Sequence, residues 1–238
     1  MIDIHSHILP ELDDGSSGMT ESMEMLQMAY RQGIRQVVAT PHYSRRFSNT
    51  SPEQIRKLCM DVQETACRDY NMDLKIYPGQ EIMYTNDVID LLRSEKILTL
   101  ADSRYVLTEF FPTAGYSDIY RAVRELTRNG YYPVLAHAER YPCLREGERI
   151  DEIRDQGGYI QLNYRSTGGK WYDGTTRWCR KVLKEEKVDF MGTDMHNVGN
   201  RCPSTEPALK WMNKHLSKLY IWKILNENPE KVTVDEKI

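Results

Sequence analysis

Residues 1–10 of the chain read MIDIHSHILP, and in this stretch apolar Ile2 and Ile4 alternate with the polar residues around them. A period of two predicts a strand, on which His5 and His7 project from the same face. A His-x-His pair alone is weak evidence for a metal, because histidines are often ordinary core or surface residues. Metals bind imidazole and carboxylate in sets of three or more, so other polar residues must converge on this pair.

The rest of the chain repeats one pattern, in which short apolar runs alternate with amphipathic stretches from end to end. This alternation is typical of β/α units. The predicted strands run from Ile2 to His7, Ile34 to Thr40, Leu74 to Pro78, Tyr105 to Glu109, Pro133 to His137, Tyr159 to Asn163 and Val188 to Thr193. Seven strands without a Gly-rich nucleotide-binding turn favour an α/β fold whose parallel strands form a closed or nearly closed barrel.

Several helices between these strands are marked at their ends. Residues 21–31 form one predicted helix, which ends at Gly33. The stretch SPEQ (51–54) offers an N-cap, a proline at the first helical position and a glutamine three residues after the cap. Another helix begins at residue 117 or 118 and stops near Gly130, and ALKWMNKHLSK (208–218) is expected to be a surface helix.

The composition predicts one domain over residues 1–238, because this length suits a single α/β barrel. A formal net charge of -3 provides no general basic field for nucleic acid. The five cysteines form no C-x-x-C pair, which suggests neither a disulfide framework nor a zinc ribbon and fits a reducing cytosol. No apolar run approaches a membrane span, and a core strand at Ile2 leaves no room for a signal peptide, so we expect a cytoplasmic protein.

Histidines and acids lie at or after the ends of most predicted strands. In a parallel barrel these carboxyl ends share one rim, where side chains far apart in sequence form active sites. The residues at this rim are His5, His7, Asp14, His42, Glu81, Glu109, His137, Asp194 and His196. Loop residues placed at random would scatter over both rims, so we expect a site for several metals. Mixed imidazole and carboxylate ligands disfavour calcium and leave manganese, iron or zinc, with magnesium at carboxylate-rich positions.

Two arginines lie close in sequence to this set: Arg140 in the stretch HAER, and Arg201 in the loop after His196. Guanidinium groups hold phosphate oxygens bidentately, so the pair favours an anionic substrate. Arg45 and Arg46, in HYSRRF, suit either phosphate binding or a charged lid.

A competing signal for phosphate chemistry lies at CLREGER (143–149), which matches the C-x5-R spacing of cysteine-dependent phosphatases. Two glutamates within the match, Glu146 and Glu148, would stand where a phosphate dianion must bind. No predicted strand leads into Cys143. We therefore interpret this cysteine as an inert loop or helix-start residue.

Two aromatic-rich stretches, KWYDG (170–174) and KLYIWKIL (218–225), have two interpretations. Either stretch could form an interaction surface, but packing in the core or along a helix is the commoner role of such residues. We therefore expect packing rather than an interface.

The chain resembles the PHP (polymerase and histidinol phosphatase) superfamily, and within it the bacterial capsule-type, metal-dependent protein tyrosine phosphatases. The resemblance covers nearly the whole chain and rests on the motifs MIDIHSHILPELDDG, ATPHY, PGQEI, DSRYVLTEF, PVLAHAERY, GTDMHN and ENPEKV, in that order. It implies a distorted seven-stranded (β/α)7 TIM-like barrel, the PHP fold, which holds three divalent metal ions, manganese foremost among them.

Carried over position by position, the resemblance implies three ligand sets. The first is His5, His7, Glu81 and Asp194, the second is Glu81, Glu109 and His137, and the third is Asp14, His42 and His196. Arg140 and Arg201 match the phosphate-binding arginines of the family. The segment after His42 and the loop from Arg165 to Asp173 have no confident match, which leaves their part in substrate recognition open.

The reaction implied by the resemblance is hydrolysis of phosphotyrosine on a protein tail. In our hypothesis a metal-bridging hydroxide attacks phosphorus, while Arg140 and Arg201 neutralise the charge on the phosphate oxygens. A metal or its water, helped by His42, would protonate the leaving phenolate. The implied partner is the tyrosine-rich tail of a capsule or exopolysaccharide tyrosine kinase.

Two alternative functions compete with this hypothesis. One is a small-molecule phosphomonoesterase of the histidinol-phosphatase type, which a comparison of phosphotyrosine peptide with histidinol phosphate would separate. The other is a catalytically idle module that binds the kinase tail, which activity abolished by His7→Ala would exclude. A nuclease is disfavoured by the acidic balance and the absence of a basic groove in the sequence pattern. The oligomeric state and the metal do not follow from the sequence.

Overall fold

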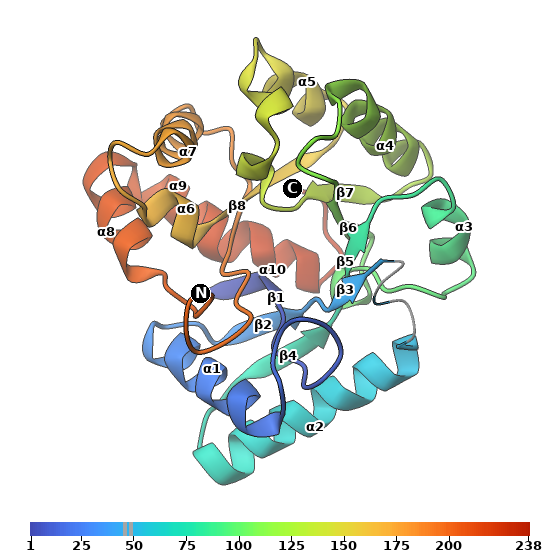
Figure 1. Ribbon diagram of the computed structural model, residues 1–238, viewed down its shortest axis with the longest axis vertical. Coiled ribbons are helices and arrows are strands. Elements are labelled where there is room, and N and C mark those ends of the chain that lie inside the picture. The colour runs from blue at the N-terminus through green and yellow to red at the C-terminus, as the bar shows by residue number, and fades with distance from the viewer. Residues whose placement is uncertain (45–46, 48–49) are drawn as a thin grey trace.

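The fold is that of a computed structural model, which describes residues 1–44, 47 and 50–238. Arg45 and Arg46, with the two roles considered for them, lie outside the described residues. Strands and helices alternate along the chain, as the sequence predicts (Figure 1). The strands are β1 (Ile2–Ser6), β2 (Gln36–Ala39), β3 (His42–Tyr43), β4 (Lys75–Pro78), β5 (Glu81–Met83), β6 (Tyr105–Glu109), β7 (Tyr132–Leu135), β8 (Tyr159–Asn163) and β9 (Phe190–Gly192).

Every strand pair among the described residues is parallel. The strands form two hydrogen-bonded sheets, with the orders β1-β2-β4 and β3-β5-β6-β7-β8-β9. Within the chain, β3 directly extends β2 and β5 extends β4, which connects the two sheets. A parallel bridge between Ser6 and Met195 places β1 beside the segment that follows β9. The parallel strands therefore curl around one centre instead of forming an open sheet.

The short strands β3 and β5 differ from the sequence prediction, which places His42 and Glu81 in loops after longer strands. In the structure these two residues lie inside the short strands and are paired with each other. Pro41 has no amide hydrogen, so the hydrogen-bonded ladder of β2 is interrupted just before β3. Both side chains are consequently held by a sheet and not by a mobile loop.

Helices cover the outside of the curled sheet (Figure 1). They are α1 (Met19–Arg31), α2 (Pro52–Tyr70), α3 (Val88–Arg93), α4 (Tyr116–Arg128), α5 (Arg149–Asp155), α6 (Tyr164–Gly168), α7 (Gly174–Lys184), α8 (Glu206–His215), α9 (Lys218–Trp222) and α10 (Asn228–Thr233), with the short turns η1 (Leu100–Asp102), η2 (Ala138–Arg140), η3 (Pro142–Arg145) and η4 (Lys223–Glu227). No helix among the described residues is long and apolar enough to cross a membrane.

The predicted cap of α2 is confirmed. Gln54 donates its backbone N–H to the Ser51 hydroxyl at 3.3 Å, and Ser51 donates its own N–H to the Gln54 side chain at 2.9 Å. This reciprocal pair satisfies two amide groups that the first turn of a helix leaves without partners. The helix predicted from residue 117 or 118 begins at Tyr116 as α4, and the predicted surface helix is confirmed as α8.

Side chains from many strands fill the interior of the curled sheet. Ile4 from β1, Val38 from β2, Leu107 from β6, Val134 from β7 and Phe190 from β9 belong to one fully buried apolar cluster. Their burial contributes the hydrophobic stabilisation that orders the strands around a common axis. The polar side chains discussed next gather at the end of this core to which the carboxyl ends of the strands point.

Candidate metal centre

The structure brings together all nine residues that the sequence placed on one rim. His5, His42, Glu81 and Glu109 lie in β1, β3, β5 and β6. The other five follow strands: His7 and Asp14 after β1, His137 after β7, and Asp194 and His196 after β9. Among the described residues, eight of the nine form three groups whose possible ligand atoms lie within 4.8 Å of one another, and His137 lies outside these groups with its Nε2 2.6 Å from Glu81. These are His5-His7-Glu81-Asp194, His42-Glu81-Glu109 and His7-Asp14-His42-His196.

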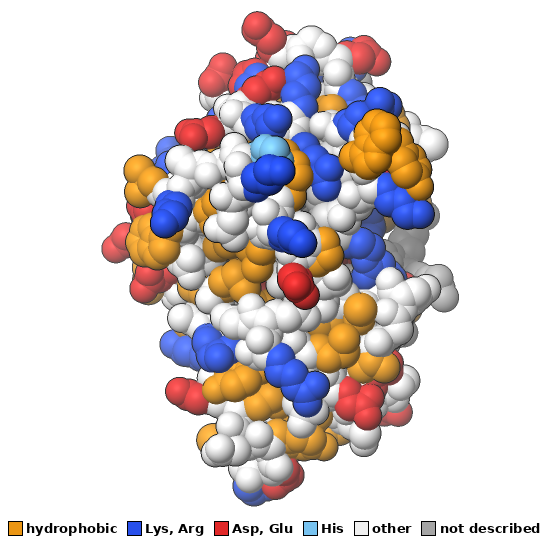
Figure 2. Space-filling model, turned by 90° about the vertical axis from the view of Figure 1, so that its left-hand side faces the viewer, with side chains coloured by type: hydrophobic (Ala, Val, Ile, Leu, Met, Phe, Trp, Pro, Cys, Tyr) orange, Lys and Arg blue, Asp and Glu red, His pale blue; other side chains and the backbone are white. Residues whose placement is uncertain are grey.

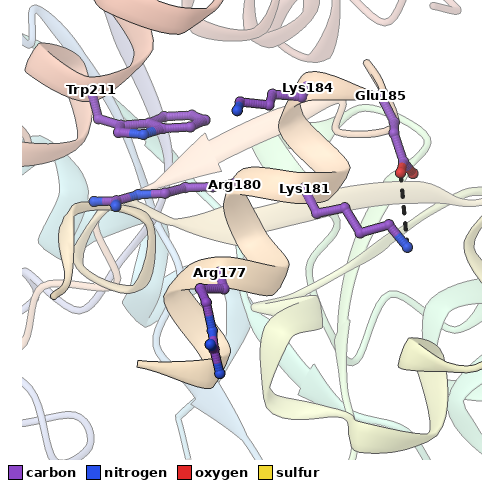
Figure 3. Close-up of a pocket in the computed structure, with 6 residues that line it drawn as sticks. All are labelled: Arg177, Arg180, Lys181, Lys184, Glu185 and Trp211. Carbon is purple, nitrogen blue, oxygen red and sulfur yellow. Dashed lines mark ion pairs between the residues drawn. The ribbon is translucent and has the colours of Figure 1, made fainter. Parts of the chain in front are cut away.

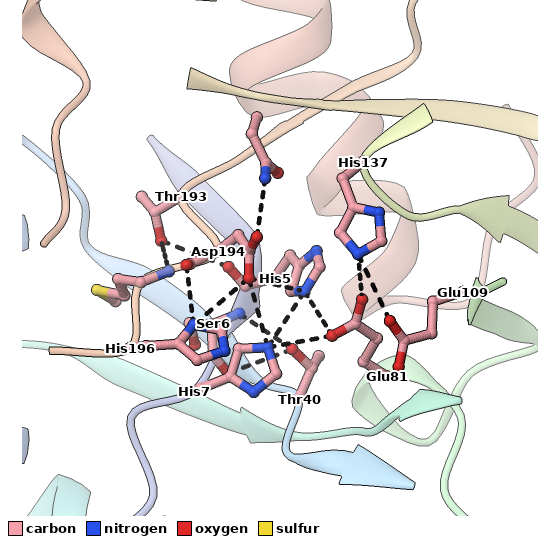
Figure 4. Close-up of polar contacts among 12 residues, drawn as sticks. His5, Ser6, His7, Thr40, Glu81, Glu109, His137, Thr193, Asp194 and His196 are labelled. Atoms are coloured by element: carbon pink, nitrogen blue, oxygen red, sulfur yellow. Dashed lines mark hydrogen bonds and ion pairs between the residues drawn. The ribbon is translucent and has the colours of Figure 1, made fainter. Parts of the chain in front are cut away.

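The first group is completely buried (Figure 4). Glu81 Oε2 lies 3.1 Å from His5 Nε2 and 3.2 Å from His7 Nε2. Asp194 Oδ1 lies 3.6 Å from each of the same two nitrogens. Two imidazoles from one strand end and two carboxylates from distant strands thus face a single point.

The other two groups open from this point towards the surface. His42 Nδ1 lies 3.2 Å from Glu81 and 3.0 Å from Glu109, while its Nε2 lies 3.4 Å from Asp14. His137 Nε2 forms a 2.6 Å contact with Glu81 and lies 3.8 Å from Glu109. Glu81 therefore lies between the groups, in the position of a bridging ligand.

Three histidines are oriented by a partner on the ring nitrogen that faces away from the cluster. His5 Nδ1 lies 3.1 Å from Gln161 Oε1, His7 Nδ1 lies 2.7 Å from Asp13 Oδ2, and His196 Nδ1 lies 3.0 Å from the carbonyl of Asp194. Because each partner is an acceptor, we assign the proton to Nδ1. The Nε2 lone pairs then point into the cluster, which is the arrangement typical of metal-binding histidines.

Two buried atoms of the cluster have no hydrogen-bond partner among the described residues: Glu81 Oε2 and His196 Nε2. Leaving buried polar atoms without partners is costly, and native proteins do so rarely. Glu81 Oε2 and His196 Nε2 each carry a lone pair and face other atoms that carry lone pairs. A proton donor or a cation placed among these atoms would satisfy them. The residues present therefore fit divalent metal ions.

The charges of the cluster also favour a cation. Burial lowers the pKa of His7, but the carboxylates of Asp13 and Glu81 outweigh it and raise the pKa to about 10. Burial raises the pKa of Glu81, but the surrounding imidazoles of His5 and His137 hold it well below its ordinary value. The carboxylates thus create a negative potential that draws positive charge into the site.

Arg140 and Arg201 lie at the edge of the cluster and contact the same carboxylate. Arg140 Nη2 donates to Asp194 Oδ2 at 2.5 Å, and Arg201 Nη2 donates to Asp194 Oδ1 at 2.9 Å. Asp194 is buried, whereas the side chains of Arg140 and Arg201 are 39% and 28% exposed. Each guanidinium therefore has further N–H groups that face the solvent beside the cluster, where an anion can bind.

Several residues that orient this site are absent from the sequence prediction. Asp13 also accepts from the backbone N–H of His42 at 2.8 Å, and Gln161 Oε1 also accepts from the N–H of His137 at 2.7 Å. Asn163 donates to Asp194 at 2.8 Å. Asp13 directly precedes a predicted ligand in the DDG motif, which is a usable signal, whereas nothing local distinguishes the amides of β8.

The cysteine alternative is not supported by the structure. Burial raises the pKa of the Cys143 thiol, whereas a nucleophilic cysteine needs a lowered one. The guanidinium of Arg149 donates to the Cys143 carbonyl at 2.6 Å and pairs with Glu146 at 2.9 Å. It is thus occupied by the chain itself and does not form a phosphate cradle with the thiol.

Comparison with solved structures first defines the class of fold. The chain superposes on an organophosphorus hydrolase from Deinococcus radiodurans with a TM-score of 0.61, 12% sequence identity, and coverage of 98% of this chain and 92% of that one. At this identity the similarity concerns the fold alone. It assigns the chain to the curled parallel α/β fold of such hydrolases.

The chain belongs to the family of capsular polysaccharide synthesis, CpsB/CapC, whose family model matches residues 1–234. It is 35% identical to the tyrosine-protein phosphatase CpsB of Streptococcus pneumoniae, over the full length of both chains. It is 30% identical to the tyrosine-protein phosphatase YwqE of Bacillus subtilis, covering 100% of this chain and 93% of that protein. A crystal structure from work on YwqE and CpsB, described as unique metal-dependent tyrosine phosphatases, superposes with a TM-score of 0.90, 30% identity, and 100% and 96% coverage.

Proposed function

We propose that this protein is a metal-dependent protein tyrosine phosphatase, a phosphoric monoester hydrolase. The observation that carries the proposal is the convergence of oriented imidazole nitrogens on buried carboxylates, beside two partly exposed arginines. Membership of the CpsB/CapC family and full-length relatives named as tyrosine phosphatases support the same activity.

The ligand sets proposed are those implied by the resemblance. His5, His7, Glu81 and Asp194 would hold one ion, Glu81, Glu109 and His137 a second, and Asp14, His42 and His196 a third. In the structure His137 contacts Glu81 at 2.6 Å, whereas His42 lies nearer to Glu109 and is grouped with Glu81 and Glu109. Manganese is proposed first, followed by iron, zinc and magnesium. We also propose that the strands correspond to the seven positions of a distorted (β/α)7 barrel, in which β2 with β3 and β4 with β5 each occupy one position, and that residues 1–238 form one catalytic domain.

Divalent ions in these sets would supply Lewis-acid activation of water and neutralise the charge of the phosphate. The residues of the chain supply orientation and proton handling. Arg140 and Arg201 hold the phosphate oxygens through their remaining N–H groups and stabilise the charge that develops on them. His42, whose side chain is 14% exposed at the open side of the cluster, would assist the departure of the phenolate through the ion that it holds, because both of its ring nitrogens face carboxylates of the cluster.

A protein substrate fits this site better than a small metabolite. Asp14 is 47% exposed and Arg140 is 39% exposed, so the cluster opens to the solvent at the rim. An open rim admits a flexible polypeptide tail, whereas small ligands are usually enclosed by their pockets. We propose the phosphotyrosine-bearing tail of a capsule-type tyrosine kinase in the cytoplasm as the partner.

The experiment that tests the proposal measures phosphate release from a phosphotyrosine peptide by metal-stripped protein, before and after the addition of manganese. We expect manganese to restore turnover in the wild type and in Cys143→Ser, and not in His7→Ala. Histidinol phosphate, assayed in parallel, should turn over much more slowly. Turnover that ignores metal and disappears in Cys143→Ser would overturn the proposal, and faster hydrolysis of histidinol phosphate would replace protein phosphatase with small-molecule phosphatase.

A further inference from the structure

A concave surface between α7 and α8 lies outside the histidine cluster. It encloses a volume of ≈ 440 Å³ and is lined by Arg177, Arg180, Lys181, Lys184, Glu185 and Trp211 (Figure 3). We call it the α7/α8 groove. Four of its six lining residues come from one face of α7, Glu185 directly follows that helix, and Trp211 of α8 forms the opposite wall.

Arg180 is held in a fixed position inside the groove. Its Nε donates to the carbonyl of Thr167 at 3.1 Å, and its Nη2 donates to the carbonyl of Gly169 at 3.0 Å. Its guanidinium also lies 5.2 Å from the centre of the Trp211 ring, and the ammonium of Lys184 lies 5.9 Å from the same ring. These cation–π contacts and the two carbonyl partners already restrict the Arg180 side chain. Binding of an anion therefore costs less side-chain conformational entropy.

The positive charge of the groove is poorly balanced. Its one acidic residue, Glu185, lies 3.9 Å from Lys181 but is shared with Lys187, which is nearer at 3.2 Å. Arg177 and Lys184 form no ion pair with any residue that the structure describes. This local excess contrasts with the formal net charge of -3 of the whole chain. Figure 2, which faces the side of the molecule with α7 and α8, shows Lys and Arg side chains grouped in the upper half of that face.

His215 of α8 lies beside the groove. Its ring lies 4.9 Å from that of Trp211, and its pKa is lowered by slight burial and by the charges of Lys184, Lys214 and Arg180. The positive side chains around the groove thus disfavour a further positive charge at His215. An anionic ligand would relieve this repulsion.

The groove is also connected to the candidate metal centre through the chain. Asn163 at the end of β8 donates to Asp194, and α6 starts at the next residue. Arg180 then holds the two carbonyls at and just beyond the end of α6. A ligand bound in the α7/α8 groove would therefore lie beside the segment that runs from Asn163 through α6, away from the candidate metal centre.

We propose that the α7/α8 groove docks an acidic stretch of the polypeptide substrate, separate from the phosphotyrosine that is hydrolysed. The charge complementarity favours carboxylates, and a concave wall with a tryptophan suits an extended chain better than a flat lipid surface. This inference rests on the proposed function for the identity of its substrate, but docking itself does not require catalysis.

The first test measures docking without hydrolysis. A fluorescein-labelled peptide rich in glutamate and lacking phosphotyrosine is titrated with wild-type protein and with the double variant Arg177→Glu/Lys184→Glu. The control variant Lys57→Glu/Arg124→Glu reverses two exposed charges on α2 and α4, so its net charge is identical. We expect about tenfold weaker binding for the groove variant only, which corresponds to about 1.4 kcal/mol shared between two surface contacts. Equal affinity of both variants would refute the docking site.

The second test measures KM and kcat with manganese present. For a phosphotyrosine peptide that carries a glutamate-rich stretch, the groove variant should have about tenfold higher KM and unchanged kcat. Free phosphotyrosine should give the same kinetics in all variants. Absence of activity towards both substrates would contradict the proposed function while leaving the binding test intact. If the groove variant no longer binds vesicles that contain anionic phosphatidylglycerol but binds the peptide as tightly as the wild type does, the groove contacts a membrane surface. That result would overturn our proposal.

Discussion

The protonation of single histidines decides what this site can bind. His5 and His7 each use one ring nitrogen for a neighbouring acceptor, which leaves the other as a lone-pair donor towards the cluster. Asp13 is the strongest of these orienting residues, because one carboxylate contacts both the His7 ring and the backbone of His42. The acceptor on the far side of the ring also makes the imidazole a better ligand.

Asp13→Asn tests this role at nearly constant size. We expect manganese affinity to fall about 10- to 100-fold, because an amide no longer enforces the required tautomer and lacks the negative charge. Competition with a fluorescent chelator measures the affinity. Asp73→Asn, at an exposed position on the chain, serves as the control and should bind metal like the wild type. Unchanged affinity in Asp13→Asn would show that the Asp13 contact only supports the loop.

At the scale of elements, close packing between helices fixes the position of a segment that follows a strand. Gly168 ends α6 against the start of α8, where a Cβ atom would lie 2.9 Å from the backbone nitrogen of Ala208 and 2.9 Å from Pro207 Cβ. Trp171 and Tyr172, just beyond this contact, are 76% and 58% exposed. The interpretation that this stretch packs in the core or along a helix is therefore wrong for these two residues.

Gly168→Ala tests the contact between α6 and α8. We expect the free energy of unfolding to fall by about 1–3 kcal/mol, since neither the backbone of Ala208 nor the proline ring can yield without moving the helices. Urea unfolding of the metal-loaded protein gives the value. Gly174→Ala, at the first residue of α7 with no atom within 4 Å of the added carbon, is the matched control and should be neutral or slightly stabilising. Equal loss of stability in both variants would contradict the argument.

At the scale of the whole molecule, the cluster links strands from all around the curled sheet. Its residues come from β1, β3, β5 and β6 and from the segments after β7 and β9. Ions bound there would cross-link elements that are distant along the chain, and binding to the native state alone stabilises it.

Metal loading should therefore raise the melting temperature. At a free manganese concentration about a hundred times Kd, the gain for one site is about 2.7 kcal/mol. Differential scanning calorimetry with manganese and with chelator measures the shift. His7→Ala, which removes a ligand shared by two of the groups, should lose most of it. Identical melting of wild-type protein under both conditions would contradict metal binding by the native state.

A buried carboxyl group away from the cluster predicts how stability depends on pH. Asp189 accepts from the backbone N–H of Ile160 at 2.9 Å and from Arg154 at 3.2 Å, and burial raises its pKa above the ordinary value of 3.8 despite this arginine. The native state then holds the proton more tightly than the unfolded chain. Its contribution to stability is complete below pH 3.8 and is lost as the pH rises through the raised pKa.

Asp189→Asn removes this titration. We expect the stability of the wild type to decline relative to the variant as the pH rises from about 4 towards the raised pKa, and the difference to become constant above it. Urea unfolding across that range measures both proteins, with Asp73→Asn as a control that should follow the wild type. A constant difference at every pH would show that Asp189 titrates in the native state as in the unfolded one.

The sequence by itself determined the alternation of strands and helices and the set of nine polar residues at one rim. Both follow from local patterns: apolar runs define each strand, and the parallel arrangement that the intervening helices require brings the strand ends together. For this reason the sequence predicts that Glu109 and His196, which are distant along the chain, belong to one cluster. The pattern also indicates Arg140, three residues beyond His137, and Arg201, in the loop after His196.

Only the tertiary structure decided which atoms face one another. The partner of His5 Nδ1 is Gln161, 156 residues away, and no local pattern distinguishes this glutamine from other polar residues of a strand. The short strands β3 and β5 depend on pairing between His42 and Glu81, which isolated segments of two and three residues would not form alone. The α7/α8 groove likewise depends on tertiary contacts, because Trp211 of α8 lies 5.2 Å from the guanidinium of Arg180 on α7. The local sequence sets secondary-structure propensity and the hydrophobic pattern. The orientation of side chains and the balance of their charges arise from contacts that form only in the folded chain.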